Sequence, residues 1–194
     1  MTRPSVAVRD ASPGDLPELM AMWDELREIG SRLERVMPAS GEDGVLERLQ
    51  AVTEDPNSRA LVATVDGEVA GMTILTATTY APLFEQRAVH AHYLHVRDGF
   101  RRRGVGKALL AAAVCFADEA DAEHVLISVL PQMRDTQRFY ARLGFSPLVV
   151  RRSVPVSVLR RRLAGQSAPS IADHLVARRR SLRRVRAAVA RTAD

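Results

Sequence analysis

The sequence of 194 residues is poor in residues that cross-link or ligate. Its one cysteine, Cys115, excludes an internal disulfide and a multi-cysteine zinc site, and we expect it to be a small core residue within the apolar run 111–117. No run approaches the roughly 18 apolar residues of a membrane span, and Met1–Asp10 lacks the apolar stretch of a secretory signal. The sequence predicts a soluble, cytoplasmic protein that uses no metal.

Lysine is also scarce, because Lys107 is the single lysine among 28 basic residues. The net charge of +5 combines two unlike parts. Residues 151–194 hold 12 arginines against two acidic residues, a net charge of +10, whereas residues 1–150 hold 16 basic against 21 acidic residues, a net charge of −5. This asymmetry predicts an acidic domain followed by a basic tail.

Hydrophobic periodicity predicts alternating strands and helices. The pair Asp66-Gly67 is the strongest turn signal, since such pairs close two-residue hairpins. The order of the elements predicts an α/β domain with a mixed sheet and helices on its faces, the helix at 104–120 being apolar on most faces and therefore buried. The predicted strands are Val6–Arg9, Arg59–Val65, Val69–Thr79, Ala88–Val96, Val125–Leu130 and Phe145–Val154, and the predicted helices are Asp15–Ile29, Gly41–Glu54, Gly104–Ala120 and Thr136–Leu143.

The remainder of the chain is predicted to be an Arg-rich helical tail at 156–194, separate from a globular domain at 1–155. Its expected helices are Val156–Leu163 and Ile171–Val189. Three interpretations stay open: docking on the acidic domain of its own or a neighbouring chain, a solvated extension, or binding to nucleic acid or an anionic surface. The tail lacks aromatic residues, which argues against stacking on single-stranded nucleic acid.

A basic, glycine-containing segment stands between the strand predicted at 88–96 and the helix predicted at 104–120. The N–H groups in the first turn of a helix have no internal partners, and the helix dipole favours anions there. Glycines let a phosphate approach the backbone closely, and arginines add positive charge. The segment is therefore suited to a pyrophosphate, and its sequence is Arg101-Arg102-Arg103-Gly104-Val105-Gly106-Lys107.

Two common phosphate-binding loops are excluded by single residues. A Walker A loop needs glycine and Ser or Thr at the positions of Arg101 and Ala108. A dinucleotide-binding fingerprint needs a third glycine at the position of Leu109.

The segment Val96–Gly106 instead resembles the signature of the GNAT acetyltransferase family, Arg/Gln-x-x-Gly-x-Gly/Ala. A second segment, Arg138–Phe145, resembles the family's terminal motif, in which a helix carrying a tyrosine ends at Leu-Gly-Phe. Arg102, Asp98 and Met133 depart from residues that relatives often have at these positions. The resemblance covers about residues 5–150. It implies the GNAT fold, with a mixed, mostly antiparallel sheet flanked by helices, and an N-acetyltransferase that uses acetyl-CoA.

The resemblance also implies roles for individual residues. Tyr140 is expected to stabilise or protonate the departing thiolate, because a thiol has a pKa of about 8.5 and a phenol one of about 10; the alternative is a core aromatic residue beside Phe139. Strand backbone is expected along the pantetheine, and loop amides on the pyrophosphate. The implied cofactor-binding residues are Leu94, His95, Val96, Arg101, Arg102, Arg103, Gly104, Val105, Gly106 and Lys107.

A protonated amine cannot attack a thioester, so the acceptor needs a base. Many relatives use a glutamate on the strand before the phosphate loop, but this strand has no acidic residue. His90 and His92 are two residues apart and share one face of the strand, whereas His95 is expected on the other. The pair resembles the serotonin (arylalkylamine) N-acetyltransferase branch of the family, which implies a base or proton relay. The alternative is two ordinary hydrogen-bonded strand histidines.

The substrate is the feature that the sequence predicts least well. Tyr80, Phe84 and Glu85 lie in a loop that often lines the acceptor cleft, where they would suit an aryl or alkyl amine or simply pack the loop. The resemblance implies direct attack by a primary amine of a small molecule in a ternary complex. Two alternatives are an acyl-CoA-binding regulatory module with a nucleic-acid-binding tail, and an acetyltransferase of protein N-termini or lysines. A homodimer is also left open.

Overall fold

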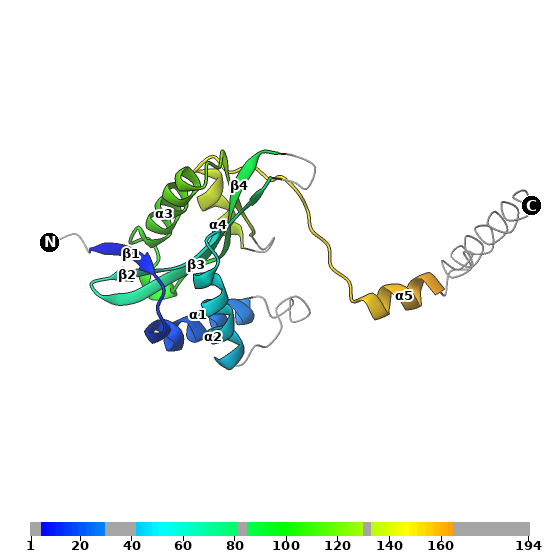
Figure 1. Ribbon diagram of the computed structural model, residues 1–194, viewed down its shortest axis with the longest axis horizontal. Helices are drawn as coiled ribbons and strands as arrows, with labels where there is room; N and C mark the ends of the chain where they lie inside the picture. The colour runs from blue at the N-terminus through cyan, green and yellow to red at the C-terminus, as the bar shows by residue number, and fades with distance from the viewer. Residues whose placement is uncertain (1–4, 30–41, 81–84, 130–132, 165–194) are drawn as a thin grey trace, which may run out of the picture. The chain divides into compact units, whose positions relative to one another are not determined.

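The computed structural model describes residues 5–29, 42–80, 85–129 and 133–164, and it divides the chain into two compact units, Met1–Pro147 and Leu148–Asp194 (Figure 1). The second unit contains α5 (Val156–Ala164). The first unit contains β1 (Val6–Asp10), the 3-10 helix η1 (Pro13–Asp15), α1 (Leu16–Ile29), α2 (Glu42–Glu54), β2 (Ser58–Val65), β3 (Glu68–Thr79), β4 (Arg87–Val96), the 3-10 helix η3 (Asp98–Phe100), α3 (Val105–Glu119), β5 (His124–Ile127) and α4 (Arg134–Ala141).

The first unit is built on a five-stranded sheet in the order β1-β2-β3-β4-β5. The first three pairings are antiparallel, and β4 pairs with β5 in parallel. The predicted mixed, mostly antiparallel sheet is confirmed. The Asp66-Gly67 hairpin between β2 and β3 is confirmed too, with φ of 52° at Asp66 and 89° at Gly67, as a turn of two left-handed residues requires.

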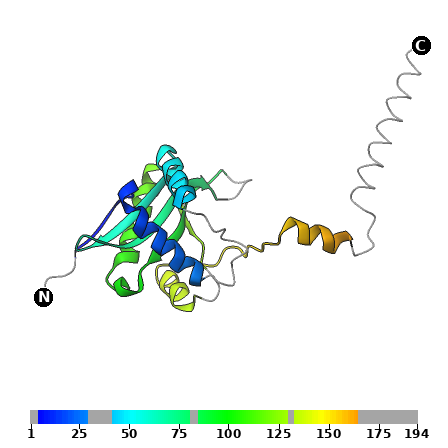
Figure 2. The ribbon, with the colours of Figure 1, turned by 90° about the horizontal axis from the view of Figure 1, so that it is seen from below.

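Helices cover both faces of this sheet (Figures 1 and 2). On one face α3 packs its buried Val105, Leu109 and Phe116 against the apolar residues of β2, β3 and β4. On the other face α1 and α2 supply a second core around Met22 and Leu49. The alternation of side chains along each strand therefore sorts residues between an α3 side and an α1–α2 side.

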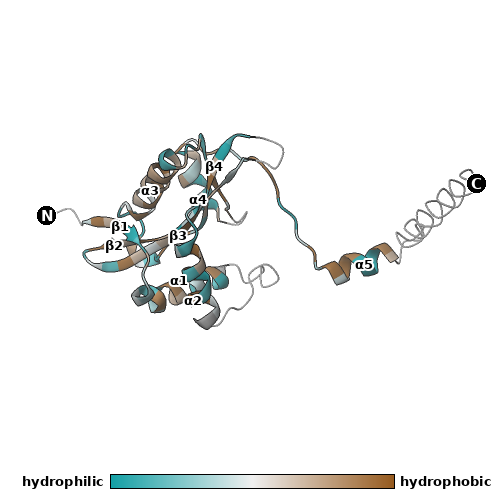
Figure 3. Cartoon of the chain, viewed as in Figure 1, coloured by the Kyte–Doolittle hydropathy of each residue, from teal (hydrophilic) through white to brown (hydrophobic). Residues whose placement is uncertain are grey.

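The helix α3 is less buried than its composition predicts. Figure 3 shows it as hydrophobic along most of its length, yet Val114 is 52% exposed and Cys115 is exposed as well. The prediction of Cys115 as a core residue is therefore wrong. A helix on the outside of one sheet buries only the stripe that faces the sheet, so apolar residues on its outer side remain in solvent.

The strand predicted at Phe145–Val154 is also wrong, because residues 145–155 form neither helix nor strand. Val149 and Val150 are 71% and 83% exposed. High β-propensity reflects a good fit to a pleated, half-buried surface, and these valines have no such surface in the structure.

In the second unit, α5 confirms the helix predicted at Val156–Leu163, and it exposes Val156, Leu159 and Leu163. The helix predicted at Ile171–Val189 lies outside the described residues. Among the described helices, none combines the length and apolar character that crossing a membrane requires.

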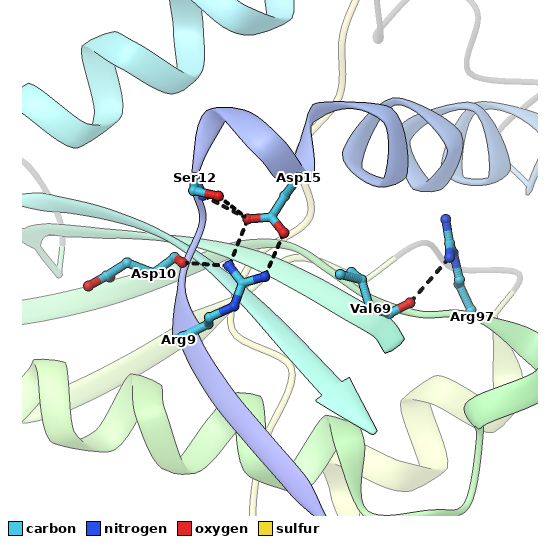
Figure 4. Close-up of polar contacts among 6 residues, drawn as sticks. All are labelled: Arg9, Asp10, Ser12, Asp15, Val69 and Arg97. Carbon is cyan, nitrogen blue, oxygen red and sulfur yellow. Dashed lines mark hydrogen bonds and ion pairs between the residues drawn. The ribbon is translucent and has the colours of Figure 1, made fainter. Parts of the chain in front are cut away.

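The N-terminal strand is tied to the entrance of α1 by an ion pair between the half-exposed Arg9 and the buried Asp15 (Figure 4). Arg9 donates to both carboxylate oxygens of Asp15 at 2.7 and 2.6 Å, and the N–H and hydroxyl of Ser12 each donate to Oδ2 of Asp15 at 2.8 Å. The hydrogen bond from Arg9, with those from Ser12, holds the pKa of Asp15 well below its usual range in spite of burial.

We expect Asp15→Asn to lower the free energy of unfolding at pH 7 by about 2 kcal/mol, because a charged acceptor of several hydrogen bonds is lost. The folded-state pKa lies below the unfolded value of about 4, so this contribution is present above pH 4 and disappears as the pH falls. Urea unfolding at pH 7 and pH 3 measures both effects. Asp10→Asn, at an exposed position of the same strand, is the control. Equal stability of Asp15→Asn and the wild-type protein at pH 7 would contradict this account.

Candidate active site

The entrance to α3 presents backbone donors to solvent. Arg101, Arg102, Arg103 and Gly104 are all exposed. The first helical hydrogen bond runs from the N–H of Ala108 to the carbonyl of Gly104 at 3.0 Å. Within the described part of the chain, no backbone bond uses the N–H groups of residues 102–107. The loop therefore offers several converging donors at the positive end of a helix dipole, which is the chemistry that an anion needs.

Glycine at this entrance is favoured by backbone conformation at Gly104. Gly104 caps α3 with φ of 95°, and a Cβ there would meet no atom within 4 Å. Gly106, two residues further in, has its missing Cβ 3.5 Å from the ring of Phe139 in α4. Gly104 thus keeps the approach to the donors open, and Gly106 lets α3 pack beside α4.

Arginines of the loop contact residues of the preceding 3-10 helix η3, and these contacts help to hold the loop in place. Arg101 pairs with Asp98 at 2.7 Å, and the guanidinium of Arg103 lies 5.4 Å from the ring centre of Phe100. Arg102 adopts φ of 63°, which is uncommon for a residue with a side chain. Such a backbone conformation turns successive N–H groups toward one side, as in other anion-binding nests.

The strand that leads into this loop carries a β-bulge. Met72 pairs with His95 and Ile74 pairs with His92, so β3 uses one residue where β4 uses two. The extra residue falls at Tyr93 and Leu94, and Tyr93 has φ of 53°. Thr73, buried between the paired positions of β3, donates its hydroxyl to the carbonyl of His92 at 3.0 Å.

The pairing of β4 with β5 ends just before the bulge. The parallel pairing covers residues 88–91 of β4 and 124–127 of β5, and in the described residues it goes no further. The side chains of Leu94 and Val96 pack toward the α3 core. The last residues of β4 therefore lie in a strand that is unpaired on its β5 side, immediately before the exposed loop.

His90 and His92 lie together as predicted, with their ring centres 3.8 Å apart. Nε2 of His90 and Oγ of Ser128 are 3.0 Å apart. Their partners on β3 are Thr76 and Ile74. The alternating residues Val89 and Ala91 face the α3 core, so the two rings lie on the α1–α2 side of the sheet.

The prediction that His95 points to the opposite face is wrong. The bulge shifts the alternation by one residue, so His95 lies on the α1 side, where its Nε2 is 2.7 Å from Oε2 of Glu25. Its side chain is 3% exposed. As one of the implied cofactor-binding residues, His95 can contribute backbone groups, while its ring is held beneath α1.

Glu25 is the functional candidate that the sequence analysis missed. It lies 70 positions from His95 in the chain, and α1 brings its carboxylate to β4. Its other oxygen, Oε1, is 3.7 Å from Nε of Arg97. The strand has no acidic residue of its own, but the fold supplies one from a neighbouring helix.

Tyr140 lies in α4 and is 4% exposed. Its ring packs edge-on against Phe139 and Phe145, at centre distances of 5.2 and 5.4 Å. Burial raises the pKa of the Tyr140 phenol above its ordinary value, so the hydroxyl stays protonated at every physiological pH. Tyr140 is therefore a core aromatic residue whose hydroxyl can donate a hydrogen bond.

The loop residues proposed for the acceptor are not gathered at the histidine pair. Tyr80 packs on His124, 4.8 Å between ring centres, at the end of the sheet where β4 begins, and Glu85 is exposed. Phe84 lies outside the described residues. Across the residues that the structure describes, no three His, Cys, Asp or Glu side chains are grouped to hold a metal ion.

In the described residues, a bulged strand whose pairing with β5 ends at Ala91 is followed by a helix whose first N–H groups make no backbone hydrogen bond, an arrangement suited to an extended ligand with an anionic end. A family model described as "Acetyltransferase (GNAT) family" matches residues 21–145. The chain therefore belongs to the GNAT acetyltransferase family.

Individual relatives agree with this assignment. Streptothricin acetyltransferase of Streptomyces lavendulae is 31% identical over 128 residues, which is 62% of each of the two chains, less than two thirds of that relative's length. Two solved structures share the fold. A transcriptional regulator from Bacillus halodurans C-125 has a TM-score of 0.66 at 24% identity and covers 78% of this chain and 99% of its own. An aminoglycoside acetyltransferase from an uncultured soil sample has a TM-score of 0.58 at 19% identity and covers 78% and 96%.

Proposed function

We propose that this protein transfers an acetyl group from acetyl-CoA to a primary amine of a small molecule, by direct attack in a ternary complex. The observation that carries the proposal is the open entrance of α3, where, among the described residues, the amides of residues 102–107 make no backbone hydrogen bond and the end of β4 has no pairing with β5. The named activities of the streptothricin and aminoglycoside relatives support an acceptor of this kind.

The residues at the entrance of α3 and at the end of β4 are suited to acetyl-CoA, the acetyl donor. Acetyl-CoA, when bound, supplies an activated thioester. The amides from Arg102 to Lys107 hold its pyrophosphate, and Arg101 and Arg103 add positive charge at that end. Gly104 leaves the approach open, with no atom within 4 Å of its missing Cβ. The backbone of Leu94, His95 and Val96 lines the pantetheine on the splayed side of β4.

The acceptor amine loses its proton to the histidine pair. The ring centres of His90 and His92 are 3.8 Å apart, and two protonated imidazoles at that distance repel each other. A neutral imidazole of the pair accepts that proton. The hydrogen-bond contact with Ser128 orients the ring of His90. Tyr140 donates a proton or a hydrogen bond to the sulfur as it leaves.

We expect the double variant His90→Gln plus His92→Gln to lower kcat/KM by about 100-fold, since general-base catalysis is commonly worth this much. Glutamine still forms hydrogen bonds but does not titrate, so the rise of the rate with pH around neutrality should vanish. His124→Gln, whose ring packs on Tyr80, is the matched control and should keep the wild-type profile. An unchanged pH–rate profile in the double variant contradicts the proposed base.

The activity itself is tested by release of free coenzyme A from acetyl-CoA across a panel of amines. The panel holds streptothricin, aminoglycosides, arylalkylamines and peptides with a free N-terminus or lysine. Turnover with a small-molecule amine supports the proposal. Turnover with peptides alone assigns a protein acceptor, and binding of acetyl-CoA without any turnover assigns an acyl-CoA-binding module. Either of these two results overturns the proposed reaction.

A further inference from the structure

A face of β4 that exists only because of the bulge is held by α1. Tyr93, His95 and Arg97 alternate along the strand, and each contacts α1. The ring of Tyr93 packs edge-on against Trp23 at 4.9 Å. Nε2 of His95 is 2.7 Å from Glu25, and Arg97 donates to the carbonyl of Glu18 at 3.4 Å.

These contacts require the bulged register. In an unbroken strand, residues 93 and 95 would continue the row of Val89 and Ala91, which faces the α3 core. A shift of one residue sends every following side chain to the other face. The contacts with α1 therefore form only when the bulge is in place, and they stabilise the bulged strand against the regular one.

Glu25 is the centre of this arrangement. One carboxylate oxygen faces the buried Nε2 of His95 and the other lies 3.7 Å from Nε of Arg97. That Nε is a buried donor with no hydrogen-bond acceptor in the described residues, so Glu25 is the anion that its charge faces. A buried imidazole and a buried guanidinium nitrogen both depend on this one side chain.

Arg97 connects the arrangement to the phosphate loop. It is the last residue before η3, and its own backbone N–H donates to the carbonyl of Ala70 at 3.0 Å. Its guanidinium donates to the carbonyl of Val69 at 3.2 Å (Figure 4). A displacement of Arg97 is therefore transmitted through residues 98–101 to residues 102–107, whose amides are proposed to hold the pyrophosphate.

We propose that Glu25 is a positioning residue for acetyl-CoA: by pairing with His95 and Arg97 it holds β4 in the bulged register and fixes the start of the phosphate loop. The proposal rests on the function proposed above, because it concerns how the same cofactor site is kept in shape. Glu25 itself need not touch acetyl-CoA or the acceptor.

The test compares Glu25→Ala with a neighbour on the same helix. Among the described residues, the ion pair of Asp24 is with Arg27 of the same helix at 3.3 Å, so Asp24→Ala removes an acidic side chain of α1 that has no recorded ion pair with β4. Calorimetric titration with acetyl-CoA should show Kd raised about tenfold in Glu25→Ala and unchanged in Asp24→Ala. Glu25→Gln keeps an acceptor for His95 and should recover part of the affinity.

Leu49→Ala is the control for a general loss of stability, because it opens a cavity in the second core, away from β4. At a temperature where all variants are folded, hydrogen exchange of the amides of residues 93–107 should quicken in Glu25→Ala but not in Leu49→Ala. Steady-state rates should show a raised KM for acetyl-CoA with kcat little changed.

A folded Glu25→Ala protein that binds acetyl-CoA as the wild type does overturns the proposal, and so does faster exchange without a change in Kd. If the wild-type protein binds no acetyl-CoA, the proposed function fails. Hydrogen exchange then still decides whether Glu25 holds the bulge.

Discussion

Replacement of Gly104 by glutamate is expected to abolish binding of acetyl-CoA, with Kd raised by at least about 100-fold. The side chain would start from a position with no atom within 4 Å and place a carboxylate at the open N-terminus of α3. That carboxylate would occupy the amides of the phosphate loop and repel the pyrophosphate. Calorimetry or thermal stabilisation by acetyl-CoA measures the loss.

The control for this substitution is built into the fold. Gly67 has φ of 89°, close to the 95° of Gly104, and a Cβ there also meets no atom within 4 Å. Gly67→Glu therefore imposes a similar backbone cost in the hairpin between β2 and β3, at a turn that is not part of the phosphate loop. It should leave acetyl-CoA binding intact. Normal thermal stabilisation of Gly104→Glu by acetyl-CoA would refute the phosphate site.

The second large effect is expected at Tyr140. Tyr140→Phe should lower kcat by about 100-fold with little change in the affinity for acetyl-CoA, because it removes a proton donor to the leaving sulfur and keeps the ring. Single-turnover rates with a productive amine measure it. Tyr80→Phe, at a ring that packs on His124, should be silent. A wild-type kcat in Tyr140→Phe would contradict this role and show that Tyr140 serves only in packing.

The same substitution carries a stability signature. The folded-state pKa of Tyr140 is raised by burial above the unfolded value of about 10. Between the two values the unfolded chain loses the proton and the folded chain keeps it, so stability falls as the pH rises above 10. The alkaline decline should be shallower in Tyr140→Phe, and a parallel decline in both proteins would contradict the burial of this phenol.

Much of the fold can be predicted from local sequence patterns. The Asp66-Gly67 turn, the strand before the loop and the glycine-capped helix all carry short-range signals that match their backbone conformations. The exposed, glycine-capped loop before α3 is predictable because it depends on the backbone of consecutive residues, and its binding of a phosphate stays a prediction. His90 and His92 are predictable as neighbours because two residues in one regular strand must share a face.

The bulge was not predicted, because side chains along a regular strand alternate between its two faces without interruption. A signal is nevertheless present: the apolar residues that face α3 are Val89 and Ala91 before the bulge and Leu94 and Val96 after it. A step of three between apolar positions breaks the period of two. Reading that break would have placed His95 on the α1 side.

Glu25 could not be identified from the sequence by the same reasoning. Its contacts with His95 and Arg97 depend on how α1 crosses the sheet, which no local pattern determines. The exposure of Cys115 has the same origin, since the apolar composition of a helix does not say which of its sides meets the sheet.

The central claim is that the backbone amides at the entrance of α3 hold a pyrophosphate. Amide chemical shifts of ¹⁵N-labelled protein, followed during titration with coenzyme A and with pantetheine, test it directly, since pantetheine lacks the pyrophosphate. The account predicts that the amides from Arg102 to Lys107 shift strongly with coenzyme A and stay in place with pantetheine. Saturation with coenzyme A that leaves those amides unmoved would contradict it.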